Sequence, residues 1–392
     1  MKKIFKKYLP VFLKENIKKH INNKVIVNYY KTMYDKRALV SYITVPLRKN
    51  SLEHTNYFEV QSWVKILSEF GYNVDVIHYE NSKNIDLSSY DLICGFGDVF
   101  RRYFENSKKN NTKTIYYATG MHVCHQNQVS LQRVKDVYLE KKVWLGKSAR
   151  FVEKTWTHQT ALVDGIIALG NEICANSYKQ YYDGAVLSVE APFYKTQDAN
   201  EIMKNRKQSS KKHFLWFGSA GLIHKGLDLL LDYFSKNIGV TLHICGHIQN
   251  ELDFCRVYKK ELYEMPNIIT YGFVDIKSEL FADVLKSCSF VIFPSCSEGG
   301  AASVLTAIGN GALIPIITKE TTISTGYEIW IDDLNYIGID KAVKLVLELN
   351  DYQISELQKK NHENVQANHS QQNYFNQLKL SVSKILENKD EL

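Results

Sequence analysis

Apolar and amphipathic segments alternate along most of the chain, beginning near Arg37. The apolar segments are short, rich in β-branched and aromatic residues, and closed by glycine or a polar residue, which is typical of buried strands. In the first half we predict strands over residues 38–47, 73–79, 90–97, 114–120, 164–170 and 185–193. One helix is predicted from apolar side chains with helical spacing, namely Phe58, Val60, Trp63, Val64 and Leu67. A longer helical region is predicted over about residues 128–162.

The same alternation starts again after residues 196–212, which are polar and contain almost no residues suited to a core. We therefore predict a linker there. The strands predicted beyond it are 213–218, 240–246, 267–274, 290–295 and 312–318. The helices predicted between them cover 225–236, 278–288 and 303–311, and the last 35 or so residues are expected to be helical and polar.

Strands separated by helices predict parallel sheets covered on both faces, and hence an α/β fold of two doubly wound, Rossmann-like domains. The predicted domains are residues 37–195 and 213–350, followed by a helical segment over 351–392. Ligands on such sheets bind outside the carboxyl ends of the strands, where loops lead into helix N-termini.

The bulk composition agrees with this organisation. A chain of 392 residues with 45% hydrophobic residues is long and apolar enough for two cores. Its seven cysteines form no Cys-x-x-Cys pair, which suits a reducing cytoplasm and argues against a disulfide framework or a zinc cage. The cysteines lie at positions 94, 124, 174, 245, 255, 288 and 296.

The positive charge is concentrated in residues 1–36, while the rest of the chain is close to neutral, although the whole chain carries +7. Apolar residues recur there every four positions among lysines, at Phe5, Leu9, Leu13, Ile17 and Ile21. Two interpretations stay open: a basic amphipathic segment on an anionic membrane surface, or a basic helix packed on the first domain. Nucleic acid is not an expected partner, because the body has no matching basic patch.

This extension does not resemble a signal peptide, because its apolar stretch is short and interrupted by Lys14. No stretch is long and apolar enough to span a bilayer. The last four residues, 389–392, read KDEL, which we interpret as coincidence because no entry signal precedes it. We expect a cytoplasmic protein, peripheral on the inner face of the membrane if the extension binds lipid.

Candidate chemistry lies in the loop between the predicted strand 290–295 and the predicted helix 303–311. Glu298 is followed by Gly299 and Gly300, which let the backbone approach a ligand closely. The positive end of the helix favours a phosphate there. The carboxylate would repel phosphate but suits hydroxyl groups, and a nucleotide-sugar combines both demands.

The stretch "PSCSEGGAASVLTAIGNGALIPIIT" resembles the signature of retaining glycosyltransferases of the GT-B fold, family 4. The stretch "FLWFGSAGLIHKGLDLLLDYF" is similar to that family's upstream Lys-Gly segment, and "NIITYGFV" with the following helix and strand is similar to the run between the two. The resemblance covers about residues 213–320, whereas the N-terminal half agrees in element order alone. It implies two domains facing a central cleft.

The resemblance also implies roles for individual residues. Glu298 would accept hydrogen bonds from the donor sugar, and the N–H groups of Gly299, Gly300 and Ala301 would contact the donor. Lys225 would neutralise the donor diphosphate and stabilise the leaving group. The other donor-binding positions implied are Gly218, Ser219, Gly272, Phe273 and Thr306. His122 would face the sugar from the first domain, with His125 as its rival.

Two positions depart from the family pattern. The family's arginine falls at Ser219, so one phosphate contact is missing or supplied elsewhere. Its second glutamate, which grips the nucleotide ribose, falls at Thr306, which makes a hydrogen bond without a charge. The Asp-x-Asp metal motif of the other major glycosyltransferase fold is absent. A metal bound by His122 and His125 is not expected, because no second ligand pair follows.

The resemblance therefore implies a metal-independent glycosyltransferase without a cofactor. It would move a sugar from a nucleotide-sugar to a saccharide or lipid-linked acceptor, with retention, as in surface polysaccharide assembly. Two alternatives stay open. One is a sugar-nucleotide epimerase or hydrolase on the same fold. The other is a catalytically degenerate homologue that acts as a binding partner, which the departures at Ser219 and Thr306 keep plausible.

Overall fold

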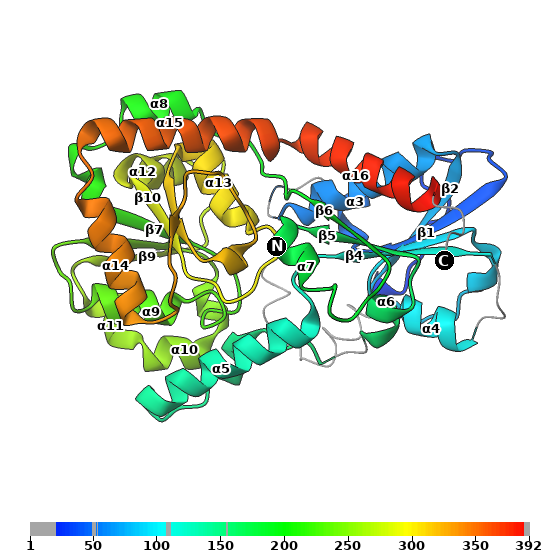
Figure 1. Cartoon of the computed structure of the whole chain (residues 1–392), viewed down its shortest axis with the longest axis horizontal. Coiled ribbons are helices and arrows are strands. Elements are labelled where there is room, and N and C mark those ends of the chain that lie inside the picture. Colours follow the sequence, from blue (N-terminus) through cyan, green and yellow to red (C-terminus); the bar gives the residue numbers. More distant parts are fainter. Residues whose placement is uncertain (1–20, 49–51, 53, 107–110, 154–155, 388–392) are drawn as a thin grey trace, which may run out of the picture.

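The computed structural model describes residues 21–48, 52, 54–106, 111–153 and 156–387. The chain forms two α/β domains that lie side by side (Figure 1). Each domain is built on a six-stranded sheet in which the named strands pair in parallel. The predicted fold class is confirmed. A strand also overlaps each of the predicted strand ranges, in the same order along the chain.

The N-terminal sheet has the strand order β2-β1-β3-β4-β5-β6. Its strands are β1 Lys36–Tyr42, β2 Tyr72–His78, β3 Leu92–Gly95, β4 Lys113–Ala118, β5 Gly165–Leu169 and β6 Ala185–Val189. Its helices are α3 Asn56–Glu69, α4 Val99–Asn106, α5 Val123–Lys141, α6 Thr157–Ala161 and α7 Glu172–Asn176. Trp63 of α3 and Tyr117 of β4 pack edge to face in its core, both almost completely buried.

The C-terminal sheet has the order β12-β11-β10-β7-β8-β9. Its strands are β7 His213–Phe217, β8 Thr241–Cys245, β9 Ile268–Gly272, β10 Phe290–Phe293, β11 Ile314–Ile317 and β12 Ile329–Trp330. Its helices are α8 Ala199–Lys204, α9 Leu227–Phe234, α10 Leu252–Val257, α11 Lys259–Glu264, α12 Glu279–Ser287, α13 Ala302–Gly311, α14 Tyr336–Leu347 and α15 Asp351–Asn368. The central strands are buried throughout, as their continuous apolar runs predict.

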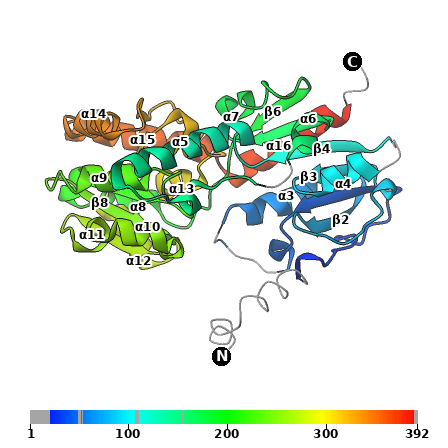
Figure 2. The same cartoon turned by 90° about the horizontal axis from the view of Figure 1, so that it is seen from below.

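Two helices tie the domains together by crossing between them. Helix α16 (Gln371–Glu387) continues from α15 over the N-terminal domain, as Figure 1 shows. There the hydroxyls of Tyr374 and Tyr117 lie 3.0 Å apart, and Gln377 accepts a hydrogen bond from the backbone N–H of Glu190. In the opposite direction, α5 leaves the N-terminal domain and runs beneath the C-terminal one (Figure 1), and the view from below shows it lying across that domain (Figure 2).

The helical region predicted over 128–162 is wrong in its extent. Helix α5 ends at Lys141, and Lys142 adopts the left-handed conformation that closes it. The chain then forms the short 3-10 helix η3 (Gly146–Ala149) before α6. Leu145 is 2% exposed, and we infer that its packing in the core outweighs the helix propensity of this segment.

Residues 196–212, predicted as a linker, contain α8 and the 3-10 helix η4 (Gln208–Lys212) and pack on the C-terminal domain. Thr196 donates to the carbonyl of Ile276 at 2.7 Å, and the hydroxyls of Ser210 and Ser289 lie 2.9 Å apart. The segment thus belongs physically to the second domain.

Part of the predicted N-terminal extension folds on the first domain. Ile26 bridges Val76 of β2, and the N–H of Asn28 donates to Asp75 at 2.7 Å. The other part of the amphipathic pattern, residues 1–20, and the terminal KDEL lie outside the described residues.

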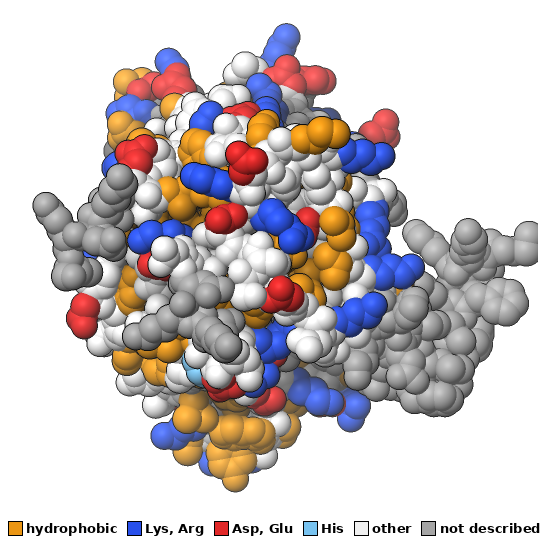
Figure 3. Space-filling view, turned by 90° about the vertical axis from the view of Figure 1, so that its right-hand side faces the viewer, with side chains coloured by type: hydrophobic (Ala, Val, Ile, Leu, Met, Phe, Trp, Pro, Cys, Tyr) orange, Lys and Arg blue, Asp and Glu red, His pale blue; other side chains and the backbone are white. Residues whose placement is uncertain are grey.

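None of the described helices has both the length and the hydropathy needed to cross a bilayer. Acidic and basic side chains lie interspersed over the outer end of the N-terminal domain (Figure 3). This mixture agrees with the near-neutral charge of the body of the chain.

Candidate active site between the two domains

The topology of the C-terminal sheet has its switch point at the carboxyl ends of β7 and β10. These strands are neighbours, but β8 and β9 follow on one side and β11 and β12 on the other. Loops after such a pair diverge and leave room for a ligand. Lys225 lies in the loop after β7, and Glu298 lies in the loop after β10.

The structure brings these two predicted residues into contact. The Nζ of Lys225 donates a hydrogen bond to Oε1 of Glu298, and the hydroxyl of Ser295 donates to the same oxygen at 3.2 Å. Both ionic side chains are nearly buried, at 6% and 10% exposed. The predicted convergence of an ammonium and a carboxylate at this edge is therefore present.

Gly226 allows the two loops to approach this closely. Its φ is +66°, a left-handed conformation that favours glycine, and it forms the N-cap of α9. A Cβ at this position would lie 2.1 Å from the carbonyl oxygen of Pro294. The turn after Lys225 thus packs directly on the end of β10, which positions the lysine beside Glu298.

Positive charges hold Glu298 ionised in spite of its burial. Burial alone would raise the pKa of this carboxyl, but Lys225, Arg150 and His224 outweigh it and lower the pKa to about 2. Nη1 of Arg150 lies 3.8 Å from Oε2, and Nε2 of His224 lies 4.0 Å from Oε1.

Two histidines near this cluster are neutral at neutral pH. Burial, reinforced by Arg150 and Lys225, lowers the pKa of His224 to about 3 despite the nearby Glu298. His54 follows β1 of the other domain and is exposed in part. Loss of surrounding water, with the charges of Arg150 and Lys225, lowers its pKa to about 4. Two cations and one carboxylate therefore leave the cluster with a net positive charge.

Arg150 reaches this cluster from the N-terminal domain. It directly follows η3, and its φ of +53° is a sparsely populated conformation for a residue with a side chain. The carbonyl of Ser148 accepts from the N–H of His224 at 3.1 Å, and the hydroxyl of Ser130 lies 2.9 Å from Nδ1 of His224. These contacts fix η3 against the loop that carries Lys225.

The glycine loop after Glu298 touches the N-terminal domain. A Cβ on Gly299 would lie 2.4 Å from the carbonyl oxygen of Thr119, so glycine is required by this close approach. The N–H of Gly300, predicted to contact a donor, donates here to Thr322 at 2.7 Å. Ala301 has a φ of +21° and forms the N-cap of α13 without a side-chain hydrogen bond, so the helix begins directly after the glycine loop.

The other predicted donor-binding residues lie at the same edge of the sheet. Gly218 and Ser219 follow β7, and Ser219 is exposed. Phe273 follows Gly272 at the end of β9, is 49% exposed and stacks on the ring of His247 at 4.4 Å. Their roles stay predictions.

Thr306, predicted to contact the ribose, is buried in the second turn of α13. Its hydroxyl donates to the carbonyl of Ala302 within the same helix at 2.7 Å. The proton of this hydroxyl is thus used locally, which is common for threonine inside a helix.

His122 is the N-cap of α5, and its Nδ1 accepts from the N–H of Cys124. Its side chain is fully buried and stacks on Tyr181 with ring centroids 4.0 Å apart. Burial, then His125, lowers its pKa to about 4, and His125 itself has a pKa lowered by burial. Its predicted contact with a sugar stays a prediction.

Within the described residues, no three His, Cys, Asp or Glu side chains are grouped as metal ligands. That the reaction needs neither metal nor cofactor stays a prediction.

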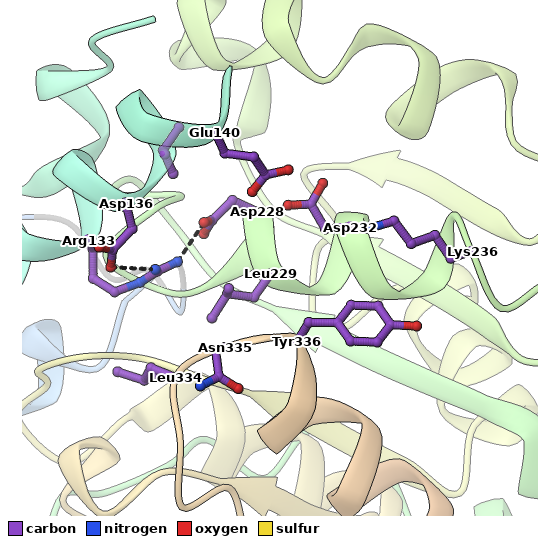
Figure 4. A pocket seen from close by; sticks show the side chains of 11 residues that line it. Arg133, Asp136, Glu140, Asp228, Leu229, Asp232, Lys236, Leu334, Asn335 and Tyr336 are labelled. Carbon is purple, nitrogen blue, oxygen red and sulfur yellow. Dashed lines mark hydrogen bonds and ion pairs between the residues drawn. The ribbon is translucent and has the colours of Figure 1, made fainter. Parts of the chain in front are cut away.

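Helix α5 forms a charged crevice with the C-terminal domain, about 260 Å³ in volume (Figure 4). Nη2 of Arg133 lies 2.5 Å from Oδ2 of Asp228 in α9, and this pair is almost completely buried. Further along, Lys141 pairs with Asp232 at 2.9 Å. These interdomain ion pairs hold α5, and with it η3, on the second domain.

Reasoning from the sequence missed Arg150, His224 and His54. His224 directly precedes Lys225, so the prediction for Lys225 could have indicated that His224 lies near the site. Arg150 lies in the stretch predicted as continuous helix, and His54 lies in the loop after the first strand. No local pattern marks either one.

No protein-family model matches the chain, and neither does any curated protein. Solved structures are similar over most of its length. Anabaena Alr3699/HepE in complex with UDP and glucose is 12% identical, with 89% of this chain and 99% of that chain covered at a TM-score of 0.56. A glycosyltransferase from Rickettsia africae is 13% identical, with 91% and 100% covered at 0.55.

A UDP-forming α,α-trehalose-phosphate synthase from Burkholderia vietnamiensis is 8% identical, with 86% of this chain and 79% of that chain covered at a TM-score of 0.50. At identities this low, the structural similarity establishes a shared fold alone. The two parallel six-stranded sheets and these similarities together show that the chain has a GT-B fold of two Rossmann-like domains.

Proposed function

We propose that this chain is a glycosyltransferase that moves a sugar from a nucleotide-sugar donor to a saccharide or lipid-linked acceptor. The observation that carries the proposal is the convergence of Lys225 and Glu298 at the switch point of the C-terminal sheet. An ammonium binds phosphate, and a carboxylate held ionised accepts hydrogen bonds from sugar hydroxyls. A nucleotide-sugar presents both groups a few ångströms apart.

The electrostatics support an anionic ligand. The described residues of the cluster carry a net positive charge, and the N-terminus of α13 adds its partial positive charge at the same edge of the sheet. In the structure, Lys225 and Glu298 bond to each other. When a donor binds, its diphosphate would replace the carboxylate at Lys225, and its hydroxyls would replace the ammonium at Glu298.

The similar structures support the same ligand class. HepE was crystallised with UDP and with UDP-glucose, and it shares the fold over nearly its whole length. The resemblance to family 4 supports transfer with retention, in which the donor phosphate assists deprotonation of the acceptor. The N-terminal domain would bind the acceptor through loops at the carboxyl ends of its strands.

The proposal is tested by binding and then by turnover. Thermal shifts of the purified full chain are measured with UDP-, GDP-, ADP- and dTDP-sugars and with the free sugars. We expect stabilisation by one class of nucleotide-sugar and none by its free sugar. A chain that none of these donors stabilises would refute the proposal.

Turnover then separates the transferase from its alternatives. Release of the nucleotide is followed with the donor that binds, with and without a panel of saccharide and polyprenyl-phosphate acceptors. A transferase releases nucleotide faster with its acceptor. Full-rate release without any acceptor would instead indicate a hydrolase. Conversion of the donor sugar without net release of nucleotide would indicate an epimerase, and binding with neither release nor conversion would indicate the degenerate homologue.

Membrane association is part of the proposal for a lipid-linked acceptor. Because residues 21–35 pack on the N-terminal domain, the suitable variant lacks residues 1–20 alone. We expect the full chain to sediment with anionic vesicles and the truncated chain to stay in solution. Equal sedimentation of both would exclude these residues as the anchor.

A further inference from the structure

We propose that Arg150, from the N-terminal domain, binds the diphosphate of the donor opposite Lys225, so that each domain contributes one cation. This inference rests on the proposed function. It starts from the position of the guanidinium, which is 3.8 Å from Glu298 and therefore beside the ammonium that contacts the same carboxylate. Two cations of different domains thus share one acid.

The backbone around Arg150 is held for this position. Its left-handed conformation is unfavourable for a residue with a Cβ, and such strain concentrates at functional sites. Ser148, two positions earlier, accepts a hydrogen bond from the backbone of His224, the residue before Lys225. The segment that presents the arginine is therefore bonded to the segment that presents the lysine.

The side chain of Arg150 lies across Gly221, in the loop after β7. A Cβ on Gly221 would lie 2.3 Å from Cδ of Arg150, so a larger residue there would displace the arginine. The side chain remains accessible in part, since 46% of it is exposed.

The surroundings favour a doubly charged ligand. Arg150 and Lys225 repel each other. Among the described residues of this cluster, Glu298 alone compensates them, because His224 and His54 are neutral at neutral pH. Ser219, where the resemblance implies an arginine, is exposed and uncharged. A diphosphate would neutralise both cations, and the planar guanidinium suits two phosphate oxygens at once.

Nucleotide binding by four proteins tests the inference: the wild-type chain, Arg150→Gln, Arg150→Lys and the control Lys147→Gln. Lys147 is an exposed cation of the same 3-10 helix, so its variant makes the same charge change nearby. Dissociation constants are measured by calorimetry for UDP, GDP, ADP and dTDP, and for the monophosphate of whichever base binds the wild type.

We expect Arg150→Gln to weaken diphosphate binding about 10- to 100-fold, since a hydrogen bond to a charged group is lost. Arg150→Lys should retain part of the affinity, and Lys147→Gln should match the wild type. Binding of the monophosphate should change less than about twofold, because the second phosphate is absent.

Three results would decide against the inference. Diphosphate binding by Arg150→Gln as tight as that of the wild type would show that the arginine does not touch the ligand. Equal weakening for diphosphate and monophosphate would show a general effect on the fold of the site. If the wild type binds none of the four diphosphates, the proposed function fails, and the inference fails with it.

Discussion

Lys225 and Glu298 are 73 positions apart in the sequence and form a hydrogen-bonded ion pair at the carboxyl edge of the C-terminal sheet. The pair is nearly buried, and the N-terminal domain approaches it through Arg150 and through Thr119, whose carbonyl lies close to Gly299. A buried pair of this kind adds little to stability by comparison with a well-packed apolar pair. Its position at the topological switch point accounts for it better.

Lys225→Ala tests the catalytic part of the proposal. We expect the rate of sugar transfer to fall about 10²- to 10³-fold, because the charge that stabilises the departing diphosphate is lost. The control is Lys260→Ala, an exposed lysine of α11. Initial rates of nucleotide release with saturating acceptor provide the measurement, and unchanged rates in Lys225→Ala would contradict the assignment.

A double-mutant cycle measures the pair itself. We expect Lys225→Met to lower the free energy of unfolding by on the order of 3 kcal/mol, because a nearly buried carboxylate loses its hydrogen-bonded cation. Lys225→Met/Glu298→Gln should be more stable than Lys225→Met, because no buried charge is left uncompensated. Denaturant unfolding of the wild type, Lys225→Met, Glu298→Gln and the double variant gives the coupling free energy. Strictly additive effects would show that the pair is not coupled.

Gly299→Ala tests the contact between the domains. The added methyl would lie 2.4 Å from the carbonyl oxygen of Thr119, so the domains or the glycine loop must move. We expect a lower Tm and at least a tenfold loss of transfer. Gly239→Ala is the matched control, since its methyl meets no atom within 4 Å. A Gly299→Ala protein as stable and active as this control would rule out a tight approach here.

Asp228→Asn tests the attachment of α5 to the second domain. We expect a loss of about 3 kcal/mol in the free energy of unfolding, because Arg133 stays buried without its charged partner. Asp136→Asn removes the exposed partner of the same arginine and should cost under about 1 kcal/mol. Chemical denaturation compares the two, and equal losses would mean that burial of the pair does not matter.

Glu190→Gln tests a carboxyl that titrates near neutral pH. Burial, then Glu172, raises the pKa of Glu190 to about 7, and its Oε2 lies 3.7 Å from the buried His369. Because the folded state holds the proton more tightly, Glu190 makes the wild type lose stability as pH rises from about 4.5 to about 7. We expect Glu190→Gln to gain at most about 3 kcal/mol relative to the wild type at pH 8, and little at pH 4.

Unfolding in denaturant at pH 4, 6 and 8 measures this difference. Glu264→Gln, at an exposed glutamate of α11, is the control and should show no pH-dependent difference. A Glu190→Gln protein whose advantage does not grow between pH 4 and pH 8 would show that this carboxyl ionises normally.

Much of the fold was predictable because local patterns of apolar residues indicate its strands and helices. The apolar runs around Phe290 and Ile314 are continuous, as strands buried on both faces require, and the helix with Leu227, Leu230 and Leu231 has one apolar face. The stretch 128–162 was less predictable. Its helix stops at Lys142 because Leu145 and the turn at η3 pack on neighbouring segments, which local propensity does not contain.

The sequence alone placed Lys225 and Glu298 at one edge of the sheet, because each follows a predicted parallel strand, and the family resemblance implied that both bind one donor. The tertiary structure decided that β7 and β10 are neighbours, which brings the two side chains into contact. Only the tertiary structure decided that Arg150 of the other domain joins them. That contact depends on α5 crossing between the domains and on a left-handed residue at the end of η3. Such contacts arise from packing between segments far apart in the chain, so no local periodicity records them.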